Sequence, residues 1–200
     1  MLNCILRYPE IEFTDDDDSG TKHVTLVNLW SVNVDEAIEA SAKNNVFSFM
    51  ISRNPYERIL SAYRDFYEEI SDDGYIKEFL KMKKTDKLTF KYFVEYLVDL
   101  PIHLYNFHWV PMYLQCRPCQ MNYDILGRME SLAEDSKKIL SRLGLNNSLA
   151  HDHQTQGGSS RANLLKYYSE INPNLMEKLY KLYEMDFILF DYDRNLTVAT

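Results

Sequence analysis

Two arginines and a serine lie close together in a segment whose chemistry suits an anion. Arg53, Arg58 and Ser61 belong to the run RNPYERILS. An arginine presents paired N–H donors to the oxygens of a phosphate group, and a serine hydroxyl adds a further donor. These side chains therefore favour the binding of a phosphate monoester. The structural alternative is an arginine on the flank of a helix that pairs with a nearby acid such as Glu57.

A buried strand and a helix are predicted on either side of this cluster. Val46–Ile51 is a nearly continuous apolar run, typical of a strand that is covered on both faces of a parallel sheet. Asn54 is a good N-cap and Pro55 a good first helical residue, so a helix is predicted to begin there. Its apolar stripe at helical spacing comprises Ile59, Tyr63, Phe66 and Ile70. Three polar residues are expected off that stripe: Arg58, Ser61 and Asp65.

The order of these elements places Arg53 where ligands commonly bind. In an open parallel sheet, ligands bind beyond the carboxyl ends of the strands. The helix that follows offers free main-chain N–H groups and the positive end of its dipole. We therefore expect the strand end and the helix start to form an anion site together.

The rest of the chain alternates between strands and helices, which favours the α/β fold class. Residues 1–45 are predicted to be a poorly defined N-terminal segment. Further strands are predicted over His23–Trp30 and Met121–Leu126. Further helices are predicted over Asp35–Lys43, Leu88–Leu100, Leu132–Leu143, Leu164–Tyr168 and Pro173–Met185. Loops are predicted over Asp15–Asp18 and His151–Ser160, and an irregular segment over Asn106–Cys119. Lys77–Lys87 is predicted to be a mobile lysine-rich segment, and Asp186–Tyr192 a compact apolar tail.

Composition excludes several classes of protein. The 200 residues are 46% hydrophobic and carry a net charge of −8, which suits one packed domain and argues against a protein that coats nucleic acid. No stretch approaches the roughly 20 apolar residues that span a bilayer, and the first residues do not resemble a signal peptide. The chain as it stands is expected to be soluble and untargeted.

The cysteines leave three alternatives open. Cys116 and Cys119 form a CxxC that could be half of a metal site, a redox pair or a structural bridge, and Cys4 is the third cysteine. A tetrahedral zinc site needs two more ligands at similar spacing. The sequence has no second CxxC, and the histidines available to it are His103, His108, His151 and His153. A structural pair in an oxidising compartment is the favoured interpretation, and no metal is predicted.

Three blocks of sequence resemble, in order, motifs of the Golgi carbohydrate sulfotransferases. RNPYERILSAY is similar to their 3′-phosphate-binding motif, R-x-P-x-x-R-x-x-S-x-Y. HWVPMYLQCRPCQMNYDILGRMESLAED resembles H-W-x-P, then C-x-P-C, then Y-D-x-I-G-x-x-E-[ST]-L-x-x-D. LYKLYEMDFILFDYD resembles the end of the family, L-Y-x-x-Y-x-x-D-F-x-x-F-x-Y. The resemblance extends from about residue 46 to residue 193, and the group acts on chondroitin, dermatan, terminal GalNAc or the HNK-1 glycan.

The resemblance implies a fold, a donor and an acceptor. The fold would be the P-loop-NTPase-like sulfotransferase fold, a parallel sheet flanked by helices. The donor would be 3′-phosphoadenosine 5′-phosphosulfate (PAPS), the acceptor a sugar hydroxyl of a glycan, and the location the Golgi lumen. Arg53 and Ser61 would bind the 3′-phosphate of the donor. Asn54, Pro55 and Arg58 would shape the same loop.

The resemblance also suggests a catalytic base. His108 stands in the H-W-x-P motif, and its imidazole titrates near neutral pH, so it is the candidate that takes the acceptor proton. The structural alternative is a turn that packs Trp109 and holds His108 through the main chain. Asp124 and Glu130 are further candidates, although residues of this kind commonly hold a loop together.

One family feature has no counterpart in the sequence. Family members carry an earlier strand and a Lys-x-Gly/Ala-x-[ST] loop for the 5′-phosphosulfate, whereas Lys22 and Lys43 are the lysines before Arg53. Residues 46–200 are therefore expected to be the C-terminal part of a sulfotransferase domain whose first strand, phosphosulfate loop and membrane anchor are missing. The alternatives are an inactive relative that binds adenosine 3′,5′-bisphosphate or a partner protein, and a helical interaction module.

Overall fold

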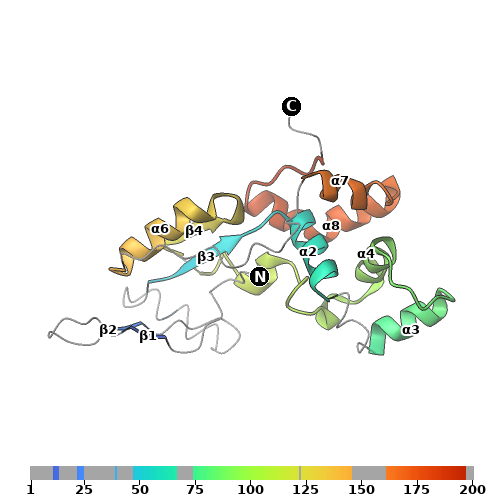
Figure 1. Cartoon of the computed structure of the whole chain (residues 1–200), viewed down its shortest axis with the longest axis horizontal. Coiled ribbons are helices and arrows are strands. Elements are labelled where there is room, and N and C mark those ends of the chain that lie inside the picture. Colours follow the sequence, from blue (N-terminus) through green and yellow to red (C-terminus); the bar gives the residue numbers. More distant parts are fainter. Residues whose placement is uncertain are drawn as a thin grey trace. The chain divides into compact units, whose positions relative to one another are not determined.

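The computed structural model describes residues 11–13, 22–24, 39, 47–66, 74–121, 123–145 and 161–196. The chain divides into two compact units. The first unit comprises residues 1–53 and 112–150, and the second comprises residues 54–111 and 151–200. Figure 1 shows the elements of both units along the chain.

The first unit contains a pair of parallel strands covered by a helix. Strand β3 (Phe49–Ser52) pairs in parallel with strand β4 (Ile125–Arg128), with Phe49 opposite Ile125. All four residues of β3 are buried, and helix α6 (Leu132–Arg142) runs beside the strand pair (Figure 1). The predicted buried strand, the predicted helix after Ser131 and the α/β class are confirmed.

Other elements of the first unit are short. Strands β1 (Ile11–Phe13) and β2 (Lys22–Val24) pair antiparallel with each other. Helix α5 (Met112–Cys116) and the 3₁₀ turn η3 (Met129–Ser131) lie before and after β4 in the sequence.

Strand β4 differs from the predicted strand Met121–Leu126. It begins at Ile125, and Leu126 is 60% exposed, so β4 has one uncovered position where β3 has none. The reason is local to Asp124, whose Oδ2 accepts hydrogen bonds from the main-chain N–H of Ser48 (2.8 Å) and from its hydroxyl (3.2 Å). This contact lies one residue before the first paired residue of β4, Ile125, and so sets the position at which the strand begins.

Asp135 ties the start of α6 to the end of β4. Its Oδ2 accepts hydrogen bonds from the Ser131 hydroxyl (2.6 Å) and the Arg128 main-chain N–H (3.0 Å), and Lys138 Nζ lies 3.2 Å from Oδ1. These contacts, the Ser131 hydroxyl foremost, hold the pKa of Asp135 below its ordinary value, although burial opposes them.

Asp135 is expected to make stability depend on pH in the acid range. Because its pKa is lowered in the folded state, the carboxylate stabilises the fold fully above its ordinary pKa of 3.8 and loses that effect as the pH falls below it. Urea unfolding at about pH 6 and about pH 3 should show a smaller acid loss for Asp135→Asn than for the native chain. Glu134→Gln, on the same helix, is the control and should behave like the native chain. Equal acid losses in the native chain and Asp135→Asn would show that another group titrates.

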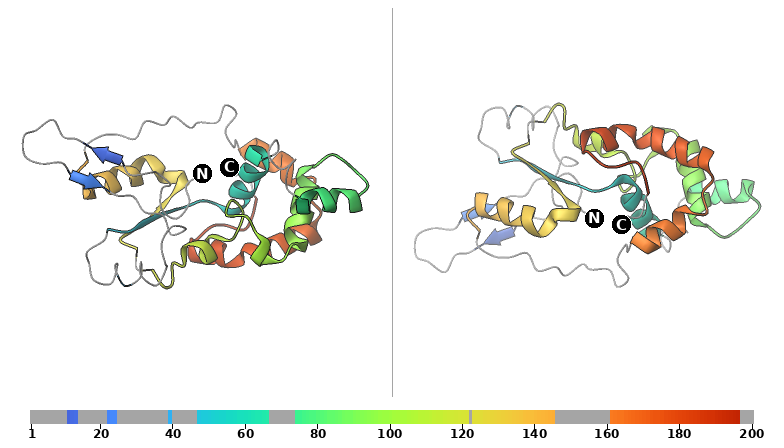
Figure 2. Two further views of the ribbon diagram at one scale, coloured as in Figure 1. Left: turned by 90° about the horizontal axis from the view of Figure 1, so that it is seen from below. Right: turned by 90° about the horizontal axis from the view of Figure 1, so that it is seen from above.

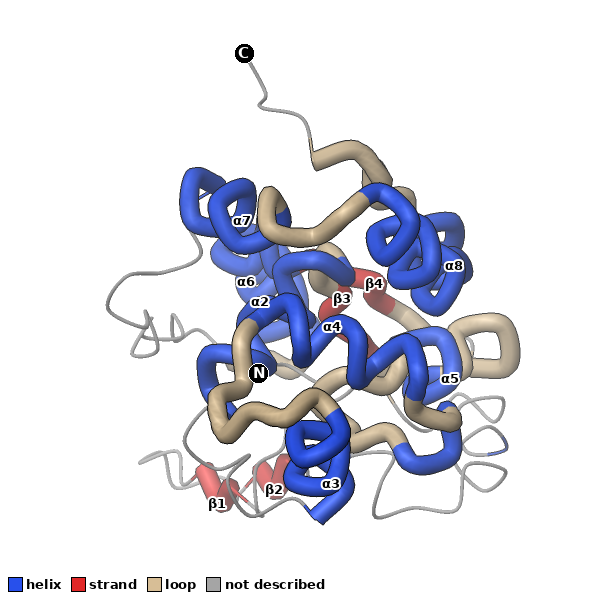
Figure 3. The backbone as a smooth tube through the Cα atoms, turned by 90° about the vertical axis from the view of Figure 1, so that its right-hand side faces the viewer, coloured by secondary structure: helices blue, strands red, loops and turns tan. Residues whose placement is uncertain are grey.

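The second unit is built from helices around an aromatic core. Its helices are α2 (Pro55–Phe66), α3 (Gly74–Met82), α4 (Phe90–Asp99), α7 (Arg161–Tyr168) and α8 (Pro173–Leu189), with the 3₁₀ turn η2 (Ile102–Leu104) after α4. Helices α4 and α8 lie side by side, as Figures 2 and 3 show. Buried rings of the core include Tyr56, Tyr63, Phe90, Phe93, Trp109, Tyr168, Tyr183 and Phe187.

Side-chain caps fix where three of these helices begin. Asn54 Oδ1 accepts a hydrogen bond from the N–H of Tyr56 (3.0 Å), directly before Pro55 at the first position of α2. Thr89 caps α4 and Asn172 caps α8 in the same way. Each cap satisfies an N–H group that the helix itself cannot bond. The predicted start of α2 is confirmed.

Three segments of the chain are more regular than predicted. Lys77–Lys87 overlaps helix α3, which forms because Ile76 and Phe79 are buried. The segment Asn106–Cys119, predicted to be irregular, contains α5. Helix α8 continues to Leu189, so Asp186 is a helical residue and does not begin a tail.

Several predicted elements lie outside the described residues. They are the loops Asp15–Asp18 and His151–Ser160, the helix Asp35–Lys43 apart from the helical residue Glu39, and most of the strand His23–Trp30. None of the helices that the structure describes combines the length and the apolar character needed to cross a bilayer.

Candidate functional site

Four of the five predicted donor-binding residues lie at the start of α2. Asn54 and Pro55 form the capped first turn, and Arg58 and Ser61 follow in the first two turns. Ser61 is partly exposed, and its hydroxyl donates a hydrogen bond to Asp65 Oδ2 at 3.2 Å. A hydroxyl at this position can donate to an anion if that anion displaces the Asp65 carboxylate.

Arg53 stands at the end of the first unit. It follows Ser52, the last residue of β3, whose hydroxyl donates to the Gly127 carbonyl oxygen at 3.2 Å. Arg53 is partly exposed, whereas Ser52 is buried. The order predicted from the sequence, a buried strand, then Arg53, then a capped helix, is therefore the observed order of the elements.

Arg58 is buried, contrary to its predicted place off the apolar stripe. It is 6% exposed; its Nη2 donates to the Val110 carbonyl oxygen at 2.6 Å and lies 3.6 Å from Asp186 Oδ2. Its guanidinium carbon also lies 5.8 Å from the centre of the Tyr183 ring. The expected pairing with an acid thus occurs, but with Asp186 and not with Glu57. The helical spacing did not reveal the burial of Arg58, because its partner Asp186 lies on α8, far along the chain.

His108 lies in a turn that Asn106 organises. Asn106 Oδ1 accepts a hydrogen bond from the main-chain N–H of His108 (3.0 Å). The main-chain carbonyl oxygen of Asn106 accepts hydrogen bonds from the N–H groups of Trp109 (3.1 Å) and Val110 (2.9 Å). His108 is partly exposed as a residue, and the centre of its imidazole lies 3.7 Å from that of the Phe107 ring. We call residues 106–110 the His108 turn.

Trp109 anchors the His108 turn in the core of the second unit. Its side chain is 2% exposed and meets the Phe93 ring edge-on, with 5.5 Å between the ring centres. The hydroxyl of Tyr183 donates a hydrogen bond to the Trp109 carbonyl oxygen. The turn therefore packs Trp109, as the structural alternative expected, and leaves His108 partly exposed.

Tyr183 and Asp186 contact the His108 turn and Arg58, and the sequence alone did not identify either of them as a site residue. Both lie on α8 and are buried, and burial raises the pKa of Tyr183 well above its ordinary value, so its hydroxyl remains a donor. A signal was present: Asp186 interrupts an apolar run, and an acid in such a run is commonly buried with a partner. The other candidate acids, Asp124 and Glu130, belong to the first unit, where Asp124 bonds to Ser48.

The two cysteines of the CxxC are not joined to each other. Cys116, at the end of α5, is buried and disulfide-bonded, whereas Cys119 is exposed and free. Arg117 between them has a left-handed conformation (φ 45°), and the turn that it starts separates the two side chains. The predicted structural pair within the CxxC is therefore wrong. The described residues contain no group of three or more His, Cys, Asp or Glu residues that could hold a metal ion.

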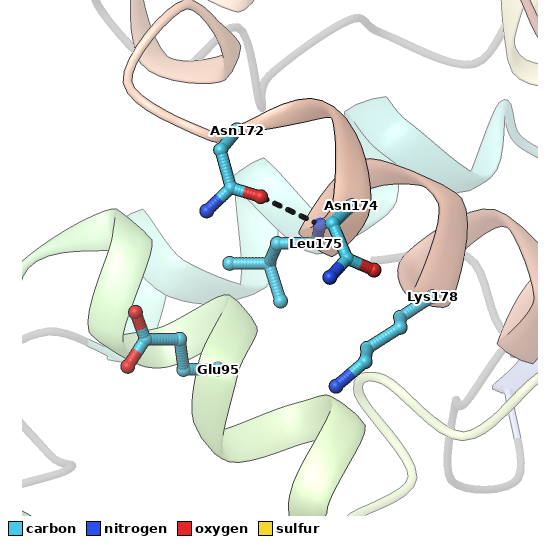
Figure 4. A pocket seen from close by; sticks show the side chains of 5 residues that line it. All are labelled: Glu95, Asn172, Asn174, Leu175 and Lys178. Atoms are coloured by element: carbon cyan, nitrogen blue, oxygen red, sulfur yellow. Dashed lines mark hydrogen bonds between the residues drawn. The ribbon is translucent and has the colours of Figure 1, made fainter.

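The second unit also has a shallow pocket, shown in Figure 4. It has a volume of about 160 Å³ and is lined by Glu95, Asn172, Asn174, Leu175 and Lys178. Pockets for cofactors and drug-sized ligands commonly have about 300–1,000 Å³. This pocket contains none of the residues predicted for the donor site, and its size does not suit a nucleotide.

Comparisons with known proteins support the interpretation of the motifs. The sulfotransferase family matches residues 4–193. Carbohydrate sulfotransferase 14 of zebrafish (Danio rerio) is 34% identical over 73% of this chain and 44% of its own length. Carbohydrate sulfotransferase 11 of mouse (Mus musculus) is 29% identical over 72% of this chain and 46% of its own length. Carbohydrate sulfotransferase 10 of rat (Rattus norvegicus) is 29% identical over 74% of this chain and 47% of its own length.

Two further facts delimit these comparisons. The chain spans about half the length of the curated relatives that it matches. No solved structure gives a significant match. Because the family match covers nearly the whole sequence, this chain belongs to the sulfotransferase family, and its curated relatives are carbohydrate sulfotransferases.

Proposed function

We propose that this chain transfers a sulfuryl group from PAPS to a sugar hydroxyl of a glycan, and that residues 46–200 are the C-terminal part of the domain that does so. The observation that carries the proposal is the capped start of α2, directly after a buried parallel strand, within a sulfotransferase sequence. The names of the relatives, carbohydrate sulfotransferases, support a glycan as the proposed acceptor. The proposed fold is that of P-loop-type sulfotransferases, and the proposed location is the Golgi lumen.

Arg53 and Ser61 are the proposed ligands of the donor's 3′-phosphate. A guanidinium and a hydroxyl form charge-assisted hydrogen bonds with a phosphate, each contributing about 1.5–3 kcal/mol. Asn54 and Pro55 support this role, because they fix the start of the helix that carries Ser61. The positive end of the α2 dipole adds to the attraction of the anion.

His108 is the proposed general base. A bond forms between the acceptor oxygen and sulfur, the bond between sulfur and the leaving phosphate oxygen breaks, and the imidazole takes the proton of the acceptor hydroxyl. The attacking and leaving oxygens would lie in line, as in phosphoryl transfer. Partial exposure of His108 supports this role, because a base must reach an acceptor that comes from solvent.

Calorimetric titration with adenosine 3′,5′-bisphosphate tests the donor site without requiring catalysis. Arg53→Ala and Ser61→Ala should each weaken binding by about 10- to 100-fold, the equivalent of one charge-assisted hydrogen bond. Asp65→Asn should tighten binding by a few-fold, because it removes a carboxylate that competes for the Ser61 hydroxyl.

Lys178→Ala is the matched control, since it removes an exposed cation from the pocket of Figure 4 and leaves α2 intact. It should bind the nucleotide as the native chain does. If the folded chain binds no nucleotide, or if all three alanine variants lose affinity equally, the proposed donor site is wrong. Binding without transfer of sulfate from PAPS to any glycan would contradict the proposed activity and retain only the donor site.

A further inference from the structure

The three family-like blocks of the sequence meet at one point of the second unit. Arg58 belongs to the first block, Trp109 to the second, and Tyr183 and Asp186 to the third. The contacts between them are direct, through the Val110 and Trp109 carbonyl oxygens, the Asp186 carboxylate and the Tyr183 ring. Residues far apart in the sequence therefore converge on the main chain that follows His108.

Two adjacent carbonyl groups of the His108 turn are held by buried donors. The Trp109 carbonyl accepts from Tyr183, and the Val110 carbonyl accepts from Arg58 at 2.6 Å. Both donors are almost completely buried, with Tyr183 0% and Arg58 6% exposed. In such surroundings a hydrogen bond is strong and its geometry well defined. Together with Asn106 on the other side, these donors restrain the main chain on both sides of the His108–Trp109 bond.

Burying the Arg58 guanidinium costs free energy of desolvation, which a purely structural role does not explain. Its Nε and Nη1 meet no acceptor in the part of the chain that the structure describes, although both atoms are buried. A buried charged pair is commonly replaced by apolar residues of similar volume without loss of stability. An arginine that pairs with Asp186 and also donates to a carbonyl is thus better explained by the orientation it imposes than by the stability it adds.

We propose that Arg58, Tyr183 and Asp186 are positioning residues that hold the His108 turn and thereby orient the His108 imidazole for proton transfer. Tyr183 and Arg58 act on the carbonyl groups of Trp109 and Val110, and Asp186 holds the Arg58 guanidinium in place. The inference rests on the proposed role of His108 as the base. In this inference Arg58 acts by holding the His108 turn and does not bind the phosphate of the donor.

Tyr183→Phe is the sharpest variant, because it removes one hydroxyl and preserves the ring. Tyr168→Phe is its matched control: Tyr168 is also buried, and its hydroxyl also donates to a carbonyl, that of Tyr56, at 2.9 Å. Both variants lose one buried hydrogen bond, so any general loss of stability is similar in the two. Only Tyr183→Phe releases the His108 turn.

Nuclear magnetic resonance of the full 200-residue chain reports on His108 directly. The imidazole resonances and their titration should change in Tyr183→Phe and match those of the native chain in Tyr168→Phe. Unchanged His108 resonances in Tyr183→Phe would overturn the inference. This comparison requires no sulfate transfer, so it decides the claim about positioning by itself.

A double-mutant cycle on transfer from PAPS then connects positioning to the reaction. A displacement of about 1 Å at a reacting group can cost about 10²-fold in rate, so Tyr183→Phe should lower kcat by about 10- to 100-fold with little change in KM for the donor. In a His108→Ala background the same change should have no further effect. Arg58→Met combined with Asp186→Leu, which removes both charges and keeps the packing, should resemble Tyr183→Phe.

The outcomes separate this inference from the proposed function. If His108→Ala lowers transfer but Tyr183→Phe does not, the positioning role is overturned and the base remains. If His108→Ala leaves transfer unchanged, the proposed base is wrong, and the inference is overturned with it. If Tyr183→Phe lowers transfer equally with and without His108, the tyrosine acts by another route and the inference is again overturned.

Discussion

Asp186→Ala is expected to lower the free energy of unfolding by about 3–5 kcal/mol, the largest effect of any single substitution considered for the second unit. The carboxylate is 1% exposed and lies 3.6 Å from Arg58 Nη2. Its removal leaves the Arg58 cation buried with no opposite charge from the described residues, and the desolvation of that cation is then uncompensated. Urea unfolding followed by tryptophan fluorescence, to which buried Trp109 contributes, measures the loss.

Glu184→Ala on the same helix is the matched control for Asp186→Ala. Glu184 forms a surface pair with Lys181, and both side chains are considerably more exposed than Asp186. Exposed pairs of this kind contribute about 0–1 kcal/mol. If Asp186→Ala cost no more than Glu184→Ala, the buried pair would not be a major source of stability. Arg58→Met combined with Asp186→Leu should recover most of the loss, because neither charge then remains unpaired.

Gly127→Ala is expected to destabilise the first unit by about 1–3 kcal/mol through overpacking. A Cβ atom at this position on β4 would lie 2.5 Å from Ile51 Cδ1 and 3.2 Å from the Asp135 Cβ. Ile51 is buried in β3, so it can move away only by disturbing the packing of the parallel strand pair. Hydrogen exchange of the β3 amides and urea unfolding followed by circular dichroism measure the effect.

Gly74→Ala provides the matched control for Gly127→Ala. Gly74 is the first residue of α3, and a Cβ there would meet nothing within 4 Å. Alanine in a helix is favoured over glycine by up to about 1 kcal/mol, so this variant should be as stable as the native chain or slightly more stable. Equal destabilisation by the two substitutions would contradict the steric explanation for Gly127.

Local sequence signals predicted the elements around the candidate donor site well. The buried strand at Phe49–Ser52 and the helix that starts at Pro55 depend on apolar runs and on a cap only one residue before the helix. The same holds for α4, which Thr89 caps, whereas α6 follows its apolar pattern without a side-chain cap from Ser131. In each case the determining interactions join residues a few positions apart, so the sequence itself contains them.

Tertiary contacts decided the features that were predicted wrongly. Strand β4 begins after Asp124 because Ser48, in another segment, donates to its carboxylate. Helix α3 forms in a lysine-rich segment because its few apolar side chains are buried in the core of the second unit. The spacing of Cys116 and Cys119 suggested a pair, but one is buried at a helix end and the other is exposed.

The sequence by itself determined the family, the strand and helix on either side of Arg53, and the cap at Asn54. Only the tertiary structure decided that Arg58 is buried against Asp186 and bonded to the main chain beside His108. The physical reason is that periodicity and capping report interactions within one or two helical turns. The burial of a charge depends on a partner from elsewhere in the chain, and folding alone brings that partner within reach.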